Sequence, residues 1–65
     1  MSARIIIETH EGARRRWYNV DLVAGNDSVA LGASIGVREN ADRVAKCWAG
    51  HLGIEIKERD WADLA

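Results

Sequence analysis

The stretch RRWYNVDLVAGNDSVALGASI, residues 15–35, decides the fold because apolar and polar residues alternate through its first half. One side of segment 15–23 carries Tyr18, Val20 and Leu22. The other side carries Trp17, Asn19 and Asp21. A period of two predicts a β-strand with one face buried. The turn residues AGND (24–27) follow, so the chain is expected to reverse into a hairpin.

Strands are also predicted on both sides of this segment. Residues 28–35 place Val29, Leu31, Ala33 and Ile35 on one face and small residues on the other, Ser28, Ala30, Gly32 and Ser34. Upstream, RIIIETH (4–10) is rich in β-branched residues and predicts a further strand. The glycine of EGA (11–13) suits a tight hairpin between this strand and the next. The first half of the chain therefore reads as an antiparallel meander.

The period changes to that of a helix after residue 40. An apolar stripe recurs at spacings of three and four, at Ala41, Val44, Ala45, Trp48, Ala49 and Leu52. We expect Asn40 as the N-cap, Gly53 at the C-terminus, and Arg38 and Asp42 on the solvent side. Packing this stripe on the sheet would bury Trp48. GIEIKER (53–59) alternates again and predicts a fourth strand, and DWADLA (60–65) a closing turn.

These elements predict an α+β fold, an antiparallel β-sheet of order β-β-β-α-β along the chain, with one amphipathic helix packed on one face. Residues 1–65 form a single small domain. A chain of this size buries only roughly 60% of the surface its unfolded form exposes. A lone cysteine excludes an internal disulfide, and one Cys with two His is too few for a closed zinc site. Good packing or oligomerisation therefore has to supply the missing stability, and of the two we expect a homodimer.

The composition of the chain argues against several classes of function. The formal charge of −1 disfavours indiscriminate binding to nucleic acid. No apolar run approaches the ~20 residues that span a bilayer, so no membrane association is expected. One cysteine without an export signal predicts a cytoplasmic protein. No glycine-rich phosphate cradle is present, and His10, Glu11, His51, Glu55 and Cys47 form no recognisable catalytic or metal-binding spacing. We expect no enzyme activity, no metal and no cofactor.

Residues 17–50 resemble the YegP-like small domain. The similarity lies in an aromatic-led strand with Tyr18, Val20 and Leu22, a turn at 24–27, then Val29, Ser34 and a helix beginning near Asn40. The family's turn reads Asn-Gly where this chain has Gly-Asn-Asp, and its tandem duplication is absent. The resemblance covers about half of the chain. It implies the same β-β-β-α fold and carries over no catalytic residue.

One helix cannot cover both sides of the sheet. If it covers the side of Tyr18, the other side presents Ile6, Trp17, Asn19, Ala30 and Gly32. A Trp and an Ile among small residues would form a flat apolar platform, and Trp is enriched among interface hot spots. We expect this side to bind a partner or a second copy. In the alternative, Trp61 or Leu64 of the C-terminus folds over Trp17.

The basic run at the first hairpin is the second candidate. Arg14, Arg15 and Arg16 precede Trp17, and arginine forks bind carboxylate or phosphate. The sequence favours a small protein-interaction module of the kind common among phage-encoded modulators or inhibitors, docking on a larger host protein. A nucleic-acid-binding module using the same hairpin is the alternative, because arginines beside an aromatic also suit single strands. In a third interpretation, the arginines of the hairpin are simply solvated and contact no partner.

Overall fold

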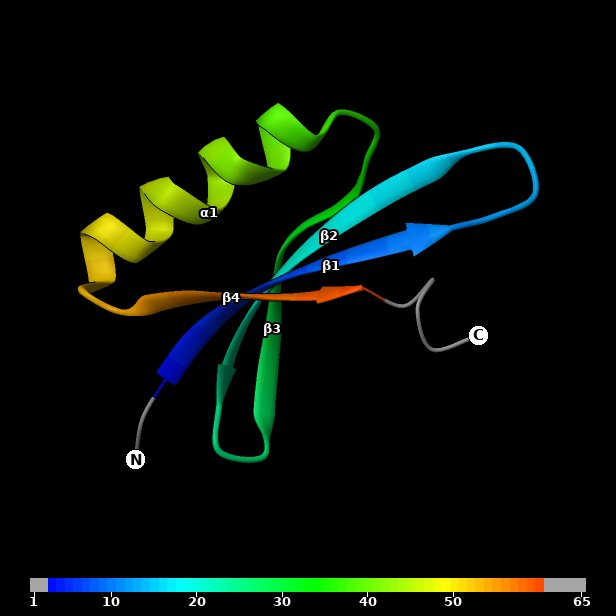
Figure 1. The fold of residues 1–65 in the computed structure, drawn as a ribbon. Coiled ribbons are helices and arrows are strands. Elements are labelled where there is room, and N and C mark those ends of the chain that lie inside the picture. The colour runs from blue at the N-terminus through cyan, green and yellow to red at the C-terminus, as the bar shows by residue number, and fades with distance from the viewer. Residues whose placement is uncertain (1–2, 61–65) are drawn as a thin grey trace.

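A computed structural model describes residues 3–60 of the chain (Figure 1). Its element order confirms the expected α+β fold. The bounds are β1 Ala3–Glu11, β2 Arg16–Ala24, β3 Asp27–Ile35, α1 Arg38–Leu52 and β4 Glu55–Asp60. The expected closing turn lies outside the described residues beyond β4. The predicted strand bounds differ from these by one or two residues.

The sheet is four-stranded, in the order β3-β2-β1-β4. β1–β2 and β2–β3 are antiparallel hairpins, as the turn residues predict. β4 returns after the helix and pairs with β1 in parallel, with Arg4 opposite Glu55 and Ile7 opposite Glu58. The chain needs α1 as the crossover for this parallel pair. β1 is therefore central, and β3 and β4 form the two edges.

The core lies between α1 and one face of the sheet. Its buried members come from β1, β2 and α1: Ile5, Ile7, Tyr18, Val20, Ala41 and Ala45. Ile5 and Val20 are the largest side chains that are fully buried. The two alanines let the helix backbone approach the strands closely. The alternation of β1 and β2 turns every second residue away from α1, and among residues 3–60 no helix lies on that other face (Figure 1).

β3 does not alternate as the sequence suggests. Val29 lies opposite Leu22, Gly32 opposite Val20, and Ile35 opposite Tyr18, with irregularities between these pairs. These bulges give the inward positions a spacing of three. The expectation that Gly32 lies on the uncovered face is thus wrong. A Cβ at Gly32 would stand 3.0 Å from Ile35 Cδ1 and 3.8 Å from Val44 Cγ1, so this glycine faces the helix and makes room for it.

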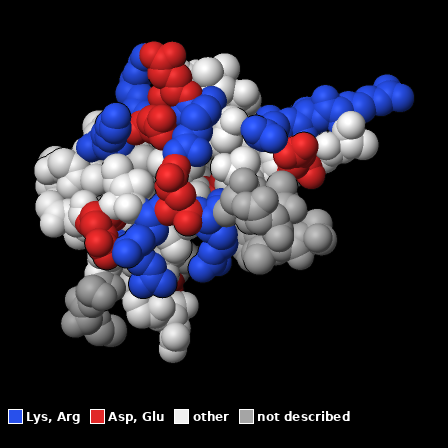
Figure 2. All heavy atoms as spheres, viewed as in Figure 1, with Lys and Arg blue, Asp and Glu red and all other residues white. Residues whose placement is uncertain are grey.

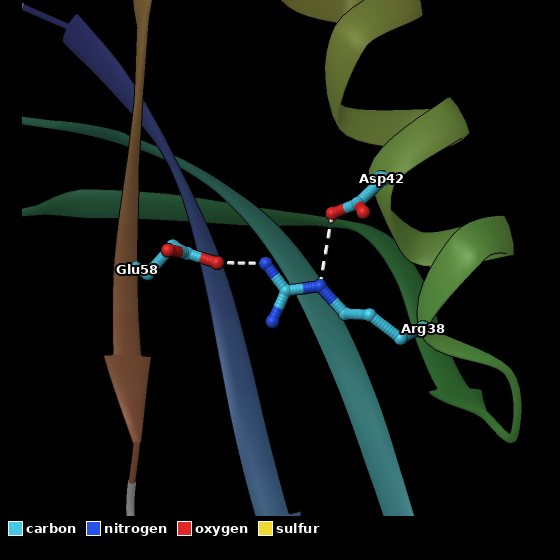
Figure 3. A network of polar contacts seen from close by, with 3 residues as sticks. All are labelled: Arg38, Asp42 and Glu58. Atoms are coloured by element: carbon cyan, nitrogen blue, oxygen red, sulfur yellow. Dashed lines mark hydrogen bonds and ion pairs between the residues drawn. The ribbon is translucent and has the colours of Figure 1, made fainter.

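The start of α1 also differs from the expectation. The N-cap is Val37, which supplies no side-chain hydrogen bond, and Asn40 lies inside the helix. Arg38, expected in solvent, is half-buried and reaches across to the sheet (Figure 3). Its Nε donates to Asp42 Oδ1 at 2.9 Å, and its Nη2 pairs with Glu58 on β4. Its guanidinium also lies 5.8 Å from the centre of the Tyr18 ring. Arg38 therefore links the first turn of α1 to β4.

The far end of α1 is less well covered. Gly53 ends the helix in the left-handed region, at φ 69°, and its N–H donates to the Ala49 carbonyl, as predicted. Trp48 is 40% exposed and Leu52 43% exposed, so the expectation that the sheet buries Trp48 is wrong. The two fully buried residues of the helix, Ala41 and Ala45, lie in its first half, whereas Ala49 in the second half is only partly buried against the core.

Candidate functional site

The Arg-rich segment lies at the free end of the β1–β2 hairpin, which extends beyond the helix (Figure 1). The strands are paired out to Glu11 and Arg16, and residues 12–15 form the connection. The Gly12 N–H donates to the Arg15 carbonyl at 2.8 Å, which closes this turn. The register is fixed by continuous pairing over the whole length of β1. The hairpin therefore presents its tip on a rigid ladder.

Trp17 is the centre of the tip. It lies opposite His10 in the register, on the face away from α1, and is half-buried. The two rings stack with centroids 5.5 Å apart and planes within 8°. The Arg15 guanidinium lies 5.1 Å from the indole centre. A Cβ at Gly12 would stand 3.2 Å from the indole, so the turn passes closely beneath the ring. A covering of Trp17 by Trp61 or Leu64 would involve residues outside the described range.

The three arginines have different surroundings. Arg16 donates to Glu11 Oε2 at 2.8 Å, and this carboxylate raises the pKa of the guanidinium above its ordinary value. Arg15 lies over Trp17. Arg14 is exposed, and no hydrogen bond or ion pair ties it to residues 3–60. Figure 2 shows basic side chains at the hairpin end and extending past it, whereas basic and acidic side chains are interleaved around the helix. The tip therefore offers two guanidinium groups, those of Arg14 and Arg15.

Two other expected contact residues are engaged within the fold. Asn19 Oδ1 accepts a hydrogen bond from the Ser34 N–H at 2.9 Å. This bond holds the backbone of β3 at Ser34, which has φ 54°. Ile6 is 7% exposed, with Asp21 and Lys57 opposite it on the neighbouring strands. Ile6 therefore offers a partner little surface, and the side-chain oxygen of Asn19 is already engaged within the fold. Of the expected contact residues, Arg14, Arg15 and Trp17 lie together at the tip.

The uncovered face is not the apolar platform that Trp17 and Ile6 suggested. Strand register places Arg4, Glu8, Asp21, Glu55, Lys57 and Arg59 on it. Opposite charges are neighbours in register, Arg4 beside Glu55 and Glu8 beside Arg59. Such a face tolerates water, which explains why one helix suffices for this sheet. The alternation of β1 and β2 already places Arg4, Glu8 and Asp21 on this face, and the parallel pairing of β4, which the sequence did not reveal, adds Glu55, Lys57 and Arg59.

Within this face, Asp21 has an altered acidity. Burial and a hydrogen bond with Glu8 raise the pKa of Asp21 from 3.8 to about 6, and His10 opposes part of the rise. The two carboxyl groups thus hold a proton between them under mildly acidic conditions.

The potential catalytic and metal-binding side chains are dispersed. His10 lies under Trp17 on the sheet, whereas His51 lies edge-on to Trp48 in α1, with ring centroids 6.4 Å apart. Cys47 is exposed on the helix, in a shallow hollow lined by Glu39, Asp42, Arg43 and Lys46. Within the described part of the chain, no group of three or more His, Cys, Asp or Glu is placed to hold a metal ion.

Comparison of the chain with models of known protein families, with curated proteins and with solved structures finds no match. The resemblance to the YegP-like domain therefore stays a prediction. Across residues 3–60, no helix has the length and apolar character needed to cross a membrane.

Proposed function

We propose that this protein is a non-enzymatic interaction module that docks its β1–β2 hairpin on an acidic surface of a larger protein. A modulator of the phage type, acting on a host protein, is the biological role that we infer. The observation that carries the proposal is the arrangement of the tip. Arg14 and Arg15 project beside Trp17 at the end of a fully paired hairpin, away from the helix.

The tip has the physical properties of a recognition element. Guanidinium groups bind carboxylates through two parallel hydrogen bonds, which gives direction as well as charge attraction. Arg15 is already held over the Trp17 ring, so less side-chain entropy is lost when it binds. Trp17 is itself fixed by His10 and by the turn at Gly12. Preorganised Arg and Trp side chains are typical of interface hot spots.

The same contacts favour a protein over a nucleic acid. Arg16 is neutralised by Glu11, which leaves two basic groups at the tip. Binding to single strands also depends on stacking a base on an aromatic face. The π face of Trp17 is already used by His10 and Arg15, so a base would have to displace one of them. We retain nucleic-acid binding as the second candidate because Arg14 and Arg15 would also accept phosphate.

The test is a titration followed by NMR amide shifts, with three probes: a glutamate-rich peptide, single-stranded DNA and single-stranded RNA. Each is added at low and at near-physiological salt. The variant Arg14→Ala/Arg15→Ala removes the free charges of the tip. The control Arg43→Ala/Lys46→Ala removes the same charge from exposed positions of α1. Because the two variants have equal net charge, any difference between them is local.

We expect the acidic peptide to shift the amides of residues 10–18 and to bind at least tenfold more weakly to the tip variant than to the control. Nucleic acid that binds more tightly than the peptide, with a steep loss on adding salt, would replace the proposal with the second candidate. Equal weakening in both variants, or no shift at the tip, would contradict a hairpin site of either kind.

A further inference from the structure

The two edge strands of the sheet differ in how they are protected from pairing with another chain. Natural sheets guard exposed edges with charged side chains, bulges or short strands. Five of the six residues of β4 are charged, Glu55, Lys57, Glu58, Arg59 and Asp60. β3 carries a single charge, Asp27 at its first position, and none from Ser28 to Ile35. The sequence thus protects β4 and leaves β3 neutral.

Bulges protect only one half of β3. The irregularities lie where β3 passes Tyr18, Val20 and Asp21 of β2. From residue 27 to residue 30 the pairing with β2 is regular, with Val29 opposite Leu22 and Ala30 opposite Asp21. The outer side of this regular segment has no strand beside it within the described chain. It is a straight, uncharged edge, which is the form most able to accept a further strand.

An exposed apolar side chain lies on this regular segment of β3. Val29 is 59% exposed on the helix-covered face. The neighbouring residues 27, 28 and 30 of β3 are exposed as well. A strand that paired with this edge would therefore cover the Val29 side chain together with the free backbone groups of β3.

We infer that a second copy of this chain pairs with this edge. The two β3 strands run antiparallel about a two-fold axis near Val29 and form one continuous sheet from two four-stranded halves. An axis perpendicular to the sheet keeps both helices on the same face. The exposed Val29 side chains of the two copies then meet on this face at the junction and are removed from water together.

The occupant is a second copy because of the charge pattern. A two-fold contact sets each edge against itself, so any charge near the axis would face its own like charge. β3 has none there, whereas self-pairing of β4 would oppose several. The small core gives the reason for association, since a 65-residue chain without a disulfide has little apolar burial of its own. The docking tip stays free, because it lies at the opposite end of β2.

The test measures self-association by sedimentation equilibrium from about 1 µM to 1 mM, a range that spans weak to moderate dimer affinities. Val29→Lys places two lysines against each other at the axis and removes the apolar contact between the two Val29 side chains. Val37→Lys is the matched control, since Val37 is 54% exposed at the helix N-cap, outside β3. Circular dichroism checks that both variants fold. We expect a wild-type dimer that Val29→Lys weakens at least tenfold and Val37→Lys leaves unchanged.

Hydrogen exchange gives a second readout that needs no variant. Amides of residues 27–31 should become more protected as the protein concentration rises, while those of β4 should not change. A wild-type monomer at 1 mM, or a dimer equally affected by both lysine variants, would overturn the inference. A monomer that still binds the acidic peptide would leave the docking hairpin intact, so the two proposals fail separately.

Discussion

Replacing Asp21 by Asn should stabilise the protein at neutral pH, although it removes a charged group that lies in a hydrogen-bonded cluster. In the folded state the Asp21 pKa is about 6, because of partial burial and the neighbouring Glu8 carboxyl, against an ordinary value of 3.8. The folded state therefore binds a proton more tightly than the unfolded state does. The proton bound at Asp21 therefore stabilises the folded state in full below about pH 4, and this stabilisation is lost as the pH rises through about 6.

The size of this change in the free energy of unfolding follows from the shift in the pKa of Asp21. One pKa unit corresponds to about 1.4 kcal/mol, so a rise of about two units sets an upper limit near 3 kcal/mol. Asp21 is half-buried, and water screens part of the repulsion between the two carboxylates. We expect wild-type free energy of unfolding to fall by about 1–1.5 kcal/mol between pH 4 and pH 7 from this pair. Asp21→Asn should abolish that fall and gain a similar amount at pH 7.

The assay is urea denaturation followed by circular dichroism, at unit steps from pH 4 to pH 8 and at a fixed low protein concentration. Urea is uncharged, so it leaves electrostatic differences intact. Asp27→Asn serves as the control, because Asp27 is exposed at the start of β3. The difference between wild type and Asp21→Asn isolates the Glu8–Asp21 pair from other titrating groups. Parallel curves for the two proteins, or a wild type whose stability rises from pH 4 to pH 7, would refute the reasoning.

Two further pairs of substitutions test the fold. Gly53→Ala should destabilise the protein by about 1 kcal/mol, because the φ of 69° at this position is unfavourable for a residue with a Cβ. Gly50→Ala, inside α1 with nothing within 4 Å of the new Cβ, should stabilise the protein by up to about 1 kcal/mol. Equal effects of the two substitutions in thermal melts would contradict the assigned C-cap. Val20→Ala should cost about 2 kcal/mol because the side chain is fully buried, and Val37→Ala less than about 0.5 kcal/mol. Chemical denaturation compares them, and similar losses would show that Val20 is not a core residue.

Two errors of sequence reasoning depend on contacts between residues distant in the sequence. Gly32 was expected to face away from the helix because alternation was extended through β3, and bulges reset it. Arg38 was expected in solvent, whereas its side chain pairs with Glu58 of β4. The uncovered face was expected to be apolar from Ile6 and Trp17, although the alternation of β1 and β2 also places Arg4, Glu8 and Asp21 on it, and β4 adds further charges.

The sequence by itself determined the elements, since alternation in residues 15–35 and the apolar stripe after residue 40 depend only on local periods of two and 3.6. It also placed Gly53 correctly, because a left-handed backbone is a local requirement. Only the tertiary structure decided that β4 lies parallel to β1, that Arg16 is neutralised while Arg14 is not, and that β3 is the neutral edge. These features arise from the order and register of the strands, which bring side chains together without leaving a periodic signal in the chain.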